Sequence, residues 1–223
     1  MYYLFLIFII LVAIFIFVSI MIYKEKENQS NIKEGLTNND NTTIILIGDS
    51  ILNNSNYILD ESKSVPGLIK AEHSDTYVFA KDGAVITDCV SQIEEIPAKN
   101  NTSKTNIFVS AGGNNILNSQ HKISKEMIDT FFQQYSTLIH SLKTKLPNTQ
   151  IYLLNLYYPL DSRFKNMYPY IEQWNTLVYE FAETNDLEII QTNKLIINNE
   201  DFTNTVEPSE IGGKKLANVI LAS

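Results

Sequence analysis

The chain has 223 residues, 44% of them hydrophobic, and its 17 Lys+Arg against 25 Asp+Glu give a formal net charge of −8. This length suggests one domain, or one domain with an appendage, and the acidic balance argues against nucleic-acid binding, which needs a basic surface. The single cysteine, Cys89, excludes an intramolecular disulfide framework and a multi-cysteine metal site.

The N-terminal segment is long and apolar. Residues 2–23 contain no charged side chain, and at about 1.5 Å per residue a helix of this length crosses the hydrocarbon core of a bilayer. A cleaved signal peptide would need a basic start and a small-residue cleavage site, and a buried core helix would need a polar stripe. We therefore expect residues 1–23 to be a single-pass transmembrane anchor. The lysines that follow favour a cytosolic domain, whereas nearby glycosylation sequons fit a lumenal one, so the side of the membrane stays open.

The rest of the chain predicts a linker and one α/β domain. Residues 24–42 are polar and have no apolar periodicity, which indicates a flexible linker. From residue 43 onward, short apolar runs predict strands at 43–47, 76–80, 106–110, 150–156 and 187–191, and amphipathic segments predict helices at 62–70, 88–96, 124–146, 170–184 and 208–221. Strands that are apolar throughout and alternate with helices predict a parallel sheet covered on both faces, in a domain over 43–223.

Polar motifs follow two of the predicted strands. The first strand runs into Gly-Asp-Ser at 48–50, and the third runs into Ala-Gly-Gly-Asn-Asn at 111–115. Sites on parallel sheets lie beyond the carboxyl ends of the strands, although each motif alone also reads as an ordinary turn. Together the motifs place a hydroxyl, backbone N–H donors and the amide of Asn114 at neighbouring strand ends. These are the groups that acyl transfer needs, a nucleophile and an oxyanion hole.

These motifs resemble the sequence blocks of the SGNH/GDSL hydrolase family of esterases and lipases. Ile-Leu-Ile-Gly-Asp-Ser-Ile at 45–51 matches the first block, with Ser50 in the position of the nucleophile. Lys-Asp-Gly-Ala at 81–84 matches the second block, and Gly-Gly-Asn at 112–114 matches the third. The order and spacing of three blocks make the resemblance far more specific than one motif, and it covers residues 43–222.

The resemblance implies a fold and a set of site residues. The implied fold is a three-layer α/β/α sandwich with a flavodoxin-like, five-stranded parallel sheet. The implied oxyanion hole consists of the backbone N–H groups of Ser50 and Gly83 and the side-chain amide of Asn114. The family's Asp after that Asn is Asn115 in this chain.

The family's last block, Asp-x-x-His, is changed in this chain. The matching stretch is Asn-Thr-Val-Glu-Pro-Ser-Glu-Ile-Gly-Gly at 204–213, in which Asn204 stands in the position of the Asp and Glu207 in that of the His. Pro208 suits the first position of the last helix, which secures this alignment. The closing Glu-Pro-Ser-x-x-Gly-Gly resembles a GDSL-like subgroup that carries this Glu.

The change affects how Ser50 would be activated. A carboxylate is a weaker base than imidazole by about two pKa units. Three interpretations of Glu207 stay open. It is a residue at the start of the last helix that interacts with the helix dipole, a base for Ser50 that Asn204 orients, or a residue that contacts the ligand. Of the three histidines, we expect only His121 to come near the site, and only if its loop folds back.

Aromatic residues gather around the loop after the fourth predicted strand. They line an acyl or sugar pocket or, as we favour, pack against the sheet: Tyr157, Tyr158, Tyr168, Tyr170 and Trp174. We expect no cofactor, because the sequence has no metal-ligand spacing and no Gly-rich phosphate loop. Two functions stay open. The first is a membrane-anchored serine hydrolase that acts on an ester or acetyl group of a small molecule, lipid or glycan. The second is a catalytically silent domain that binds a carbonyl- or acetyl-bearing ligand at a membrane.

Overall fold

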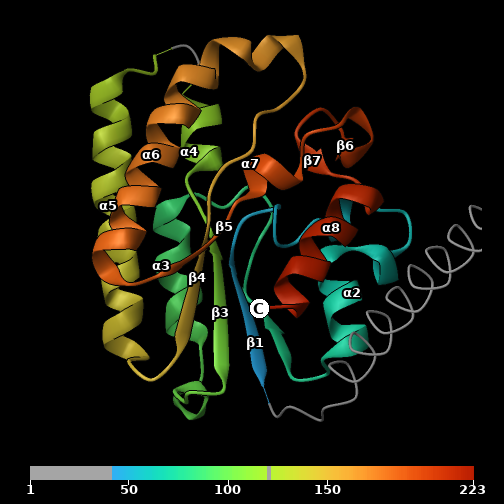
Figure 1. The fold of residues 1–223 in the computed structure, drawn as a ribbon, viewed down its shortest axis with the longest axis vertical. Coiled ribbons are helices and arrows are strands. Elements are labelled where there is room, and N and C mark those ends of the chain that lie inside the picture. The colour runs from blue at the N-terminus through green and yellow to red at the C-terminus, as the bar shows by residue number, and fades with distance from the viewer. Residues whose placement is uncertain (1–41, 120–121) are drawn as a thin grey trace, which may run out of the picture. The chain divides into compact units, whose positions relative to one another are not determined.

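A computed structural model describes residues 42–119 and 122–223. The predicted anchor at 1–23 and the predicted linker up to residue 41 lie outside these residues and are drawn as a grey trace in Figure 1. Within the described ranges, no helix is both long and apolar enough to cross a bilayer. The membrane anchor therefore stays a prediction from sequence.

Five parallel strands form the sheet in the middle of the domain (Figure 1). They are β1 (Thr43–Gly48), β2 (Thr76–Val78), β3 (Thr105–Ser110), β4 (Gln150–Leu154) and β5 (Glu188–Ile190). Their spatial order, β2-β1-β3-β4-β5, confirms the predicted five-stranded parallel sheet. The chain order reverses between β1 and β3, which pair along their whole length up to Gly48 opposite Ser110. Their carboxyl ends therefore lie side by side at the switch point where such sheets bind ligands.

Helices cover both faces of this sheet and complete three layers (Figure 1). On one face lie α3 (Ile86–Glu95), α5 (Lys125–Lys145) and α6 (Tyr168–Asn185), and on the other lie α2 (Val65–Glu72) and α8 (Glu210–Leu221). Shorter elements that the sequence pattern does not predict are α4 (Gly113–Asn118), α7 (Thr192–Leu195) and the hairpin of β6 (Phe202–Thr203) and β7 (Glu207–Pro208). Short 3₁₀ helices lie at Ser55–Tyr57, Glu61–Lys63, Ala98–Asn100, Ser162–Met167 and Asn199–Asp201.

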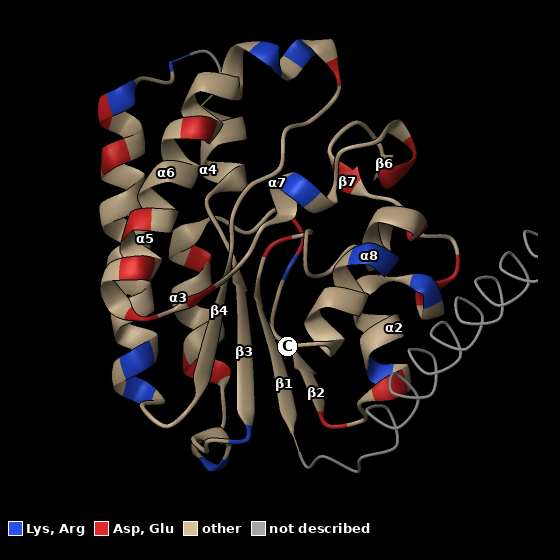
Figure 2. Cartoon of the chain, viewed as in Figure 1, with Lys and Arg blue, Asp and Glu red and all other residues tan. Residues whose placement is uncertain are grey.

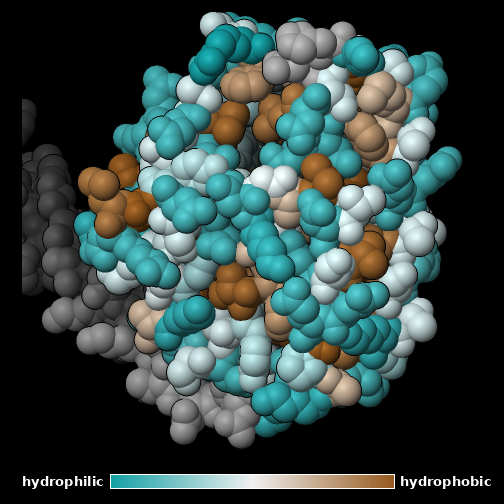
Figure 3. All heavy atoms as spheres, turned by 180° about the vertical axis from the view of Figure 1, so that it is seen from behind, coloured by the Kyte–Doolittle hydropathy of each residue, from teal (hydrophilic) through white to brown (hydrophobic). Residues whose placement is uncertain are grey.

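Apolar side chains fill the space between the layers. The predicted stripe of α5 is buried at Ile128, Tyr135, Leu138, Ile139 and Leu142. The positions of charged residues lie mostly on helices and loops (Figure 2), and the face seen in Figure 3 is mostly hydrophilic with scattered apolar residues. The domain thus has the buried sheet and solvated helices that its sequence pattern predicts.

Two boundaries differ from the prediction for identifiable reasons. β4 ends before Leu156, because the side chain of Asn175 accepts from the Leu156 N–H at 2.8 Å and donates to its C=O at 2.7 Å, replacing a neighbouring strand. The last helix begins at Glu210 and not at 208, because the Ser209 hydroxyl caps its first turn. The interpretation of Pro208 as the first helical residue is therefore wrong, and Pro208 lies in β7.

Candidate active site

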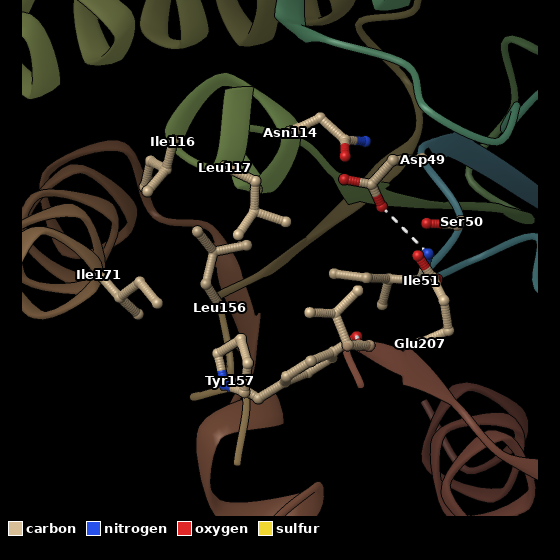
Figure 4. Close-up of a pocket in the computed structure, with 13 residues that line it drawn as sticks. Asp49, Ser50, Ile51, Asn114, Ile116, Leu117, Leu156, Tyr157, Ile171 and Glu207 are labelled. Carbon is tan, nitrogen blue, oxygen red and sulfur yellow. Dashed lines mark hydrogen bonds between the residues drawn. The ribbon is translucent and has the colours of Figure 1, made fainter. Parts of the chain in front are cut away.

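A pocket that opens to solvent lies beyond the carboxyl ends of β1 and β3 (Figure 4). Its lining residues are Asp49, Ser50, Ile51, Gly113, Asn114, Ile116, Leu117, Leu156, Tyr157, Pro159, Ile171, Val206 and Glu207. In Figure 4 the side chains of Asp49, Ser50 and Glu207 lie at one end, and those of Ile116, Leu156 and Ile171 lie at the other. The pocket thus has one end with carboxyl and hydroxyl groups and another that is apolar. No Lys, Arg or His belongs to the lining among the described residues.

Ser50 reaches this pocket from a sharp turn after β1. The turn needs a glycine at Gly48, whose φ of +132° is rare for other residues and whose added Cβ would lie 1.8 Å from the Ser110 carbonyl oxygen. The turn is closed by the Asp49 carbonyl, which accepts from the N–H of Leu52 at 3.2 Å. Ser50 is only 5% exposed, and its backbone N–H donates to no other described residue. Both the hydroxyl and the N–H are therefore available to a ligand in the pocket.

The backbone of Gly48 is held from the neighbouring layer by Gln92 of α3. The Gln92 side chain accepts from the Gly48 N–H at 2.7 Å and donates to its C=O at 2.9 Å, and this side chain is buried. A buried amide that satisfies both backbone groups fixes the end of β1 at the point where the chain turns toward Ser50.

Asn114 reaches the same pocket from the start of α4. Its Nδ2 donates to the Ala84 carbonyl at 2.9 Å, which uses one of its two amide hydrogens and leaves the second for a ligand. The next side chain, Asn115, accepts from the Ile86 N–H at 3.0 Å. The two asparagines thus join the end of β3 to the segment that leads into α3, and the Asn114 amide is fixed at the pocket wall.

Glu207 enters the pocket from β7, three residues before the first residue of α8, so its interpretation as a helix-start residue is wrong. Two hydrogen bonds fix the backbone on either side of it. Asn54 Nδ2 donates to the Pro208 carbonyl at 2.9 Å, and the Tyr157 hydroxyl donates to the Val206 carbonyl at 2.6 Å. The carboxylate is therefore carried by a short strand whose two flanking carbonyls are tied to the rest of the domain.

The surroundings of Glu207 alter its acidity. Burial raises the pKa of its carboxyl, the contact with the Ser50 hydroxyl acts in the opposite direction, and the charge of Asp82 adds to the rise. The Oε2 atom of Glu207 is buried and has no hydrogen-bond partner among the described residues. A carboxylate with a raised pKa is a stronger base than a solvated one, and this one faces a hydroxyl.

The base of the β6–β7 hairpin is anchored by Asp201, which is fully buried. Its carboxylate pairs with Lys215 of α8 at 2.7 Å and accepts from the backbone N–H groups of Ile197 and Asn198, each at 3.0 Å. Burial raises the pKa of Asp201, but the hydrogen bonds from Lys215 and the backbone outweigh it, and the pKa lies below its ordinary value. Asp201 is therefore a charged anchor that ties the strand bearing Glu207 to α8.

Two of the five predicted site residues lie outside the pocket lining. Gly83 is exposed, with a φ of +72°, and its N–H donates to no other described residue. Asn204 is exposed in the turn between β6 and β7, with a φ of +45°, and no hydrogen bond joins it to Glu207 in the described part of the chain. The structure thus brings Ser50, Asn114 and Glu207 together and leaves the other two apart.

Neither of the two described histidines lies near the pocket. His73 follows the last residue of α2, and His140 is exposed on α5, where its Nδ1 lies 2.6 Å from the carbonyl oxygen of Ser136. His121 lies outside the described residues, so its approach to Ser50 stays a prediction. Within the described pocket lining, Glu207 is the group best placed to accept a proton from Ser50.

Asp49 is a further functional candidate that its sequence context does not reveal, because an Asp between a glycine and a serine is typical of an ordinary turn. Asp49 is 1% exposed, and its Oδ1 accepts from the Ser110 hydroxyl at 2.9 Å and from the Ile51 N–H at 3.1 Å. Burial raises the pKa of Asp49 to about 7 in spite of these bonds, and the charge of Glu207 adds to the rise. The pocket therefore holds a second carboxyl with altered acidity.

The aromatic residues after β4 have two different places in the structure, because one packs in the core and another lines the pocket. Trp174 is fully buried, and its ring lies 5.2 Å from that of Tyr135 and 5.8 Å from that of Phe132. The Trp174 ring also fills the space where Gly112 would carry a Cβ, 2.2 Å away. Tyr157 lines the pocket. The expected packing against the sheet layers thus holds for Trp174, while Tyr157 contributes to the site.

No family model and no curated protein matches the sequence. Several solved structures share its fold. A member of the lipolytic protein G-D-S-L family from Veillonella parvula is 17% identical, with a TM-score of 0.65 over 81% of this chain and 97% of that chain. The lipase Lip_vut3 from a goat rumen metagenome is 19% identical, with a TM-score of 0.64 over 81% and 96% of the two chains.

A lipase/acylhydrolase from Enterococcus faecalis is 16% identical, with a TM-score of 0.60 over 81% of this chain and 94% of that chain. These three likenesses confirm the fold that the sequence blocks implied. The described domain has the α/β/α fold of GDSL-type lipolytic proteins.

Proposed function

We propose that this domain is a serine hydrolase of the SGNH/GDSL type that cleaves esters of apolar acyl groups. The observation that carries the proposal is the position of Glu207 in the same pocket as Ser50, as a half-buried carboxylate whose buried Oε2 has no hydrogen-bond partner among the described residues. The free N–H of Ser50 and the second amide hydrogen of Asn114 support the role of an oxyanion hole.

In the proposed reaction, Ser50 Oγ attacks the ester carbonyl while its proton passes to Glu207. The new Oγ–C bond pushes the carbonyl electron pair onto oxygen, where the Ser50 N–H and the Asn114 amide stabilise the charge. Collapse of this intermediate breaks the bond to the alcohol, which leaves with the proton held by Glu207. Water then attacks the acyl-serine, gives its proton to Glu207, and releases the carboxylic acid as Ser50 regains its proton.

The apolar end of the pocket supports the choice of acyl group. Ile116, Leu117, Leu156 and Ile171 line this end and offer no hydrogen-bonding side chain, which suits a hydrocarbon chain better than a sugar. Burying each further methylene stabilises binding by about 0.8 kcal/mol, so kcat/KM is expected to rise about fourfold per methylene until the chain fills this end. An acetyl group, which has a single methyl, would gain least from these contacts.

Labelling of the full chain by a fluorophosphonate probe tests the proposal. We expect one covalent adduct on Ser50 and loss of labelling in Ser50→Ala, because the probe reacts only with an activated serine. Ser91→Ala, on an exposed position of α3, is the matched control and should label like the parent. If the parent chain binds carbonyl ligands but is never labelled, the domain is instead a catalytically silent binding module.

We also propose that residues 2–23 attach the enzyme to a membrane, a part of the proposal that rests on the sequence alone. Carbonate washing of membranes from cells that make the full chain should leave the protein in the membrane fraction. The same chain starting at residue 42 should be released. Retention of both chains, or release of both, would contradict an anchor in this segment.

A further inference from the structure

We propose that Asp49 and Glu207 act as a pair that shares one proton in the active state, with Asp49 holding the proton and Glu207 free to take the one from Ser50. This inference rests on the proposed hydrolase function and adds to it a second working carboxyl. It gives Asp49 a role beyond shaping the turn that carries the nucleophile.

The hydrogen bonds of Asp49 show where its proton belongs. Oδ1 already accepts two hydrogen bonds, from the Ser110 hydroxyl and the Ile51 N–H. Oδ2 accepts none from the described residues and would lie 3.7 Å from a Cβ added at Gly113. In Figure 4 this oxygen points away from Ile51, toward the interior of the pocket. A proton on Oδ2 therefore removes the charge without breaking either bond to Oδ1.

Among the described residues, the groups around the pair supply no positive charge. Facing Asp49 are Glu207 from β7, Cys89 from α3, Tyr157 from the loop after β4 and Ser110 from β3. Burial is the largest cause of the raised pKa of the Cys89 thiol, about 12, so this thiol stays neutral beside Asp49. The titratable neighbours of Asp49 among these carry a carboxyl, a thiol and a phenol. Each of these groups is neutral or negative, so none can compensate a second negative charge.

The outer side of Glu207 is also acidic. The negative charge of Asp82 contributes to the raised pKa of Glu207. Asp82 in turn accepts a hydrogen bond from the Tyr57 hydroxyl at 2.7 Å. Glu207 is partly exposed, whereas Asp49 is almost completely buried, so burial costs the charged form of Asp49 more. When one of two neighbouring carboxyls must stay neutral, the more deeply buried one keeps the proton.

This arrangement predicts a bell-shaped dependence of kcat/KM on pH. At low pH both carboxyls are protonated, and Glu207 cannot accept the Ser50 proton. At high pH Asp49 also ionises, near pH 7 from its pKa of about 7, and places a second charge beside the developing oxyanion. Activity is therefore expected to be highest in the singly protonated state between the two limbs, whose apparent pKa values belong to the pair.

The Asp49→Asn variant tests the pair, because an amide keeps the Oδ1 acceptor and cannot ionise. We expect the full-length variant to stay active and to lose the upper limb, so that kcat/KM no longer falls between roughly pH 6 and 9. The lower limb, which reports Glu207, should remain. An upper limb identical to that of the parent chain would overturn the proposal while leaving the hydrolase function standing.

Two further measurements keep the proposal falsifiable if Asp49→Asn folds poorly or if no Ser50-dependent activity is found. Ser110→Ala removes a hydrogen bond that favours the Asp49 anion, so the upper limb should move to higher pH; no movement, or movement to lower pH, overturns the proposal. Independently of activity, the free energy of unfolding should fall as pH rises from about 4 to about 7, because the raised native pKa stabilises the protonated form. In Ser110→Ala this fall should extend to higher pH, because the loss of the Ser110 hydrogen bond raises the native pKa of Asp49 further, and an unchanged profile counts against a titrating Asp49.

Discussion

Glu207→Gln is expected to lower kcat/KM for an activated ester by roughly 10²–10⁴-fold, the usual contribution of a positioned general base. The amide has nearly the shape of the carboxylate but cannot accept the Ser50 proton. The bonds that hold this strand, from Asn54 to Pro208 and from Tyr157 to Val206, involve backbone carbonyls and stay in place. The loss should therefore appear mainly in kcat, measured by ester hydrolysis with the full chain.

Glu210→Gln provides the matched control for this variant. Glu210 lies in the first turn of α8, makes a solvent-exposed pair with Lys63 at 3.2 Å, and does not line the pocket. Surface pairs of this kind contribute at most about 1 kcal/mol, so kcat/KM should stay within a few-fold of the parent value. If Glu207→Gln hydrolyses the ester as fast as Glu210→Gln, Glu207 is not the base, and His121 becomes the next residue to test.

The layers of the fold could be read from the sequence because each long element repeats its apolar pattern several times. The stripe of α5 and the apolar run of β1 are examples, and both lie where they were predicted. The elements of six residues or fewer outside the sheet, such as α4 and α7, show no period, and tertiary contacts decide their structure. The end of β4 was mispredicted for the same reason, since a side chain 19 residues away, Asn175, replaces a strand there.

The site was predictable where a motif places a residue at a strand end. Ser50 and Asn114 belong to such motifs, and the register of β1 beside β3 brings them into one pocket. Glu207 was found by its position before Pro208, although the structure places it in a strand and not at a helix start.

What the sequence left undetected depends on contacts between distant segments. The altered acidity of Asp49 arises from its burial and from the charge of Glu207, which lies 158 positions further along the chain. The hydrogen bond from Asn54 to the Pro208 carbonyl spans 154 positions. Local patterns carry no information on such contacts. Conversely, only the alignment of the last block predicted that Asn204 belongs to the site. In the structure Asn204 lies in the turn between β6 and β7, where it is exposed to solvent.

Gly48→Ala is expected to cost more than about 4 kcal/mol of the free energy of unfolding, which is the range of exceptional core disruptions. The new Cβ would lie 1.8 Å from the Ser110 carbonyl oxygen, and its backbone φ of +132° is unfavourable for alanine. The obstacle is the backbone of β3, so no side-chain rotation relieves it. The ends of β1 and β3 would have to separate, and with them Ser50 and Asn114. A domain of this size should therefore lose more than about 10 °C in Tm.

The Gly83→Ala variant measures the cost of backbone strain alone, without the steric clash of an added Cβ that is expected in Gly48→Ala. Gly83 also has a positive φ, +72°, but an added Cβ there would meet nothing within 4 Å. Only the intrinsic penalty of the left-handed conformation applies, about 1–2 kcal/mol, which corresponds to a fall of a few °C in Tm. Thermal unfolding of both full-length variants measures the difference. Because the clash at Gly48 acts through the Ser110 carbonyl, equal losses in the two variants would mean that β1 and β3 do not meet as closely as the pairing of Gly48 with Ser110 requires.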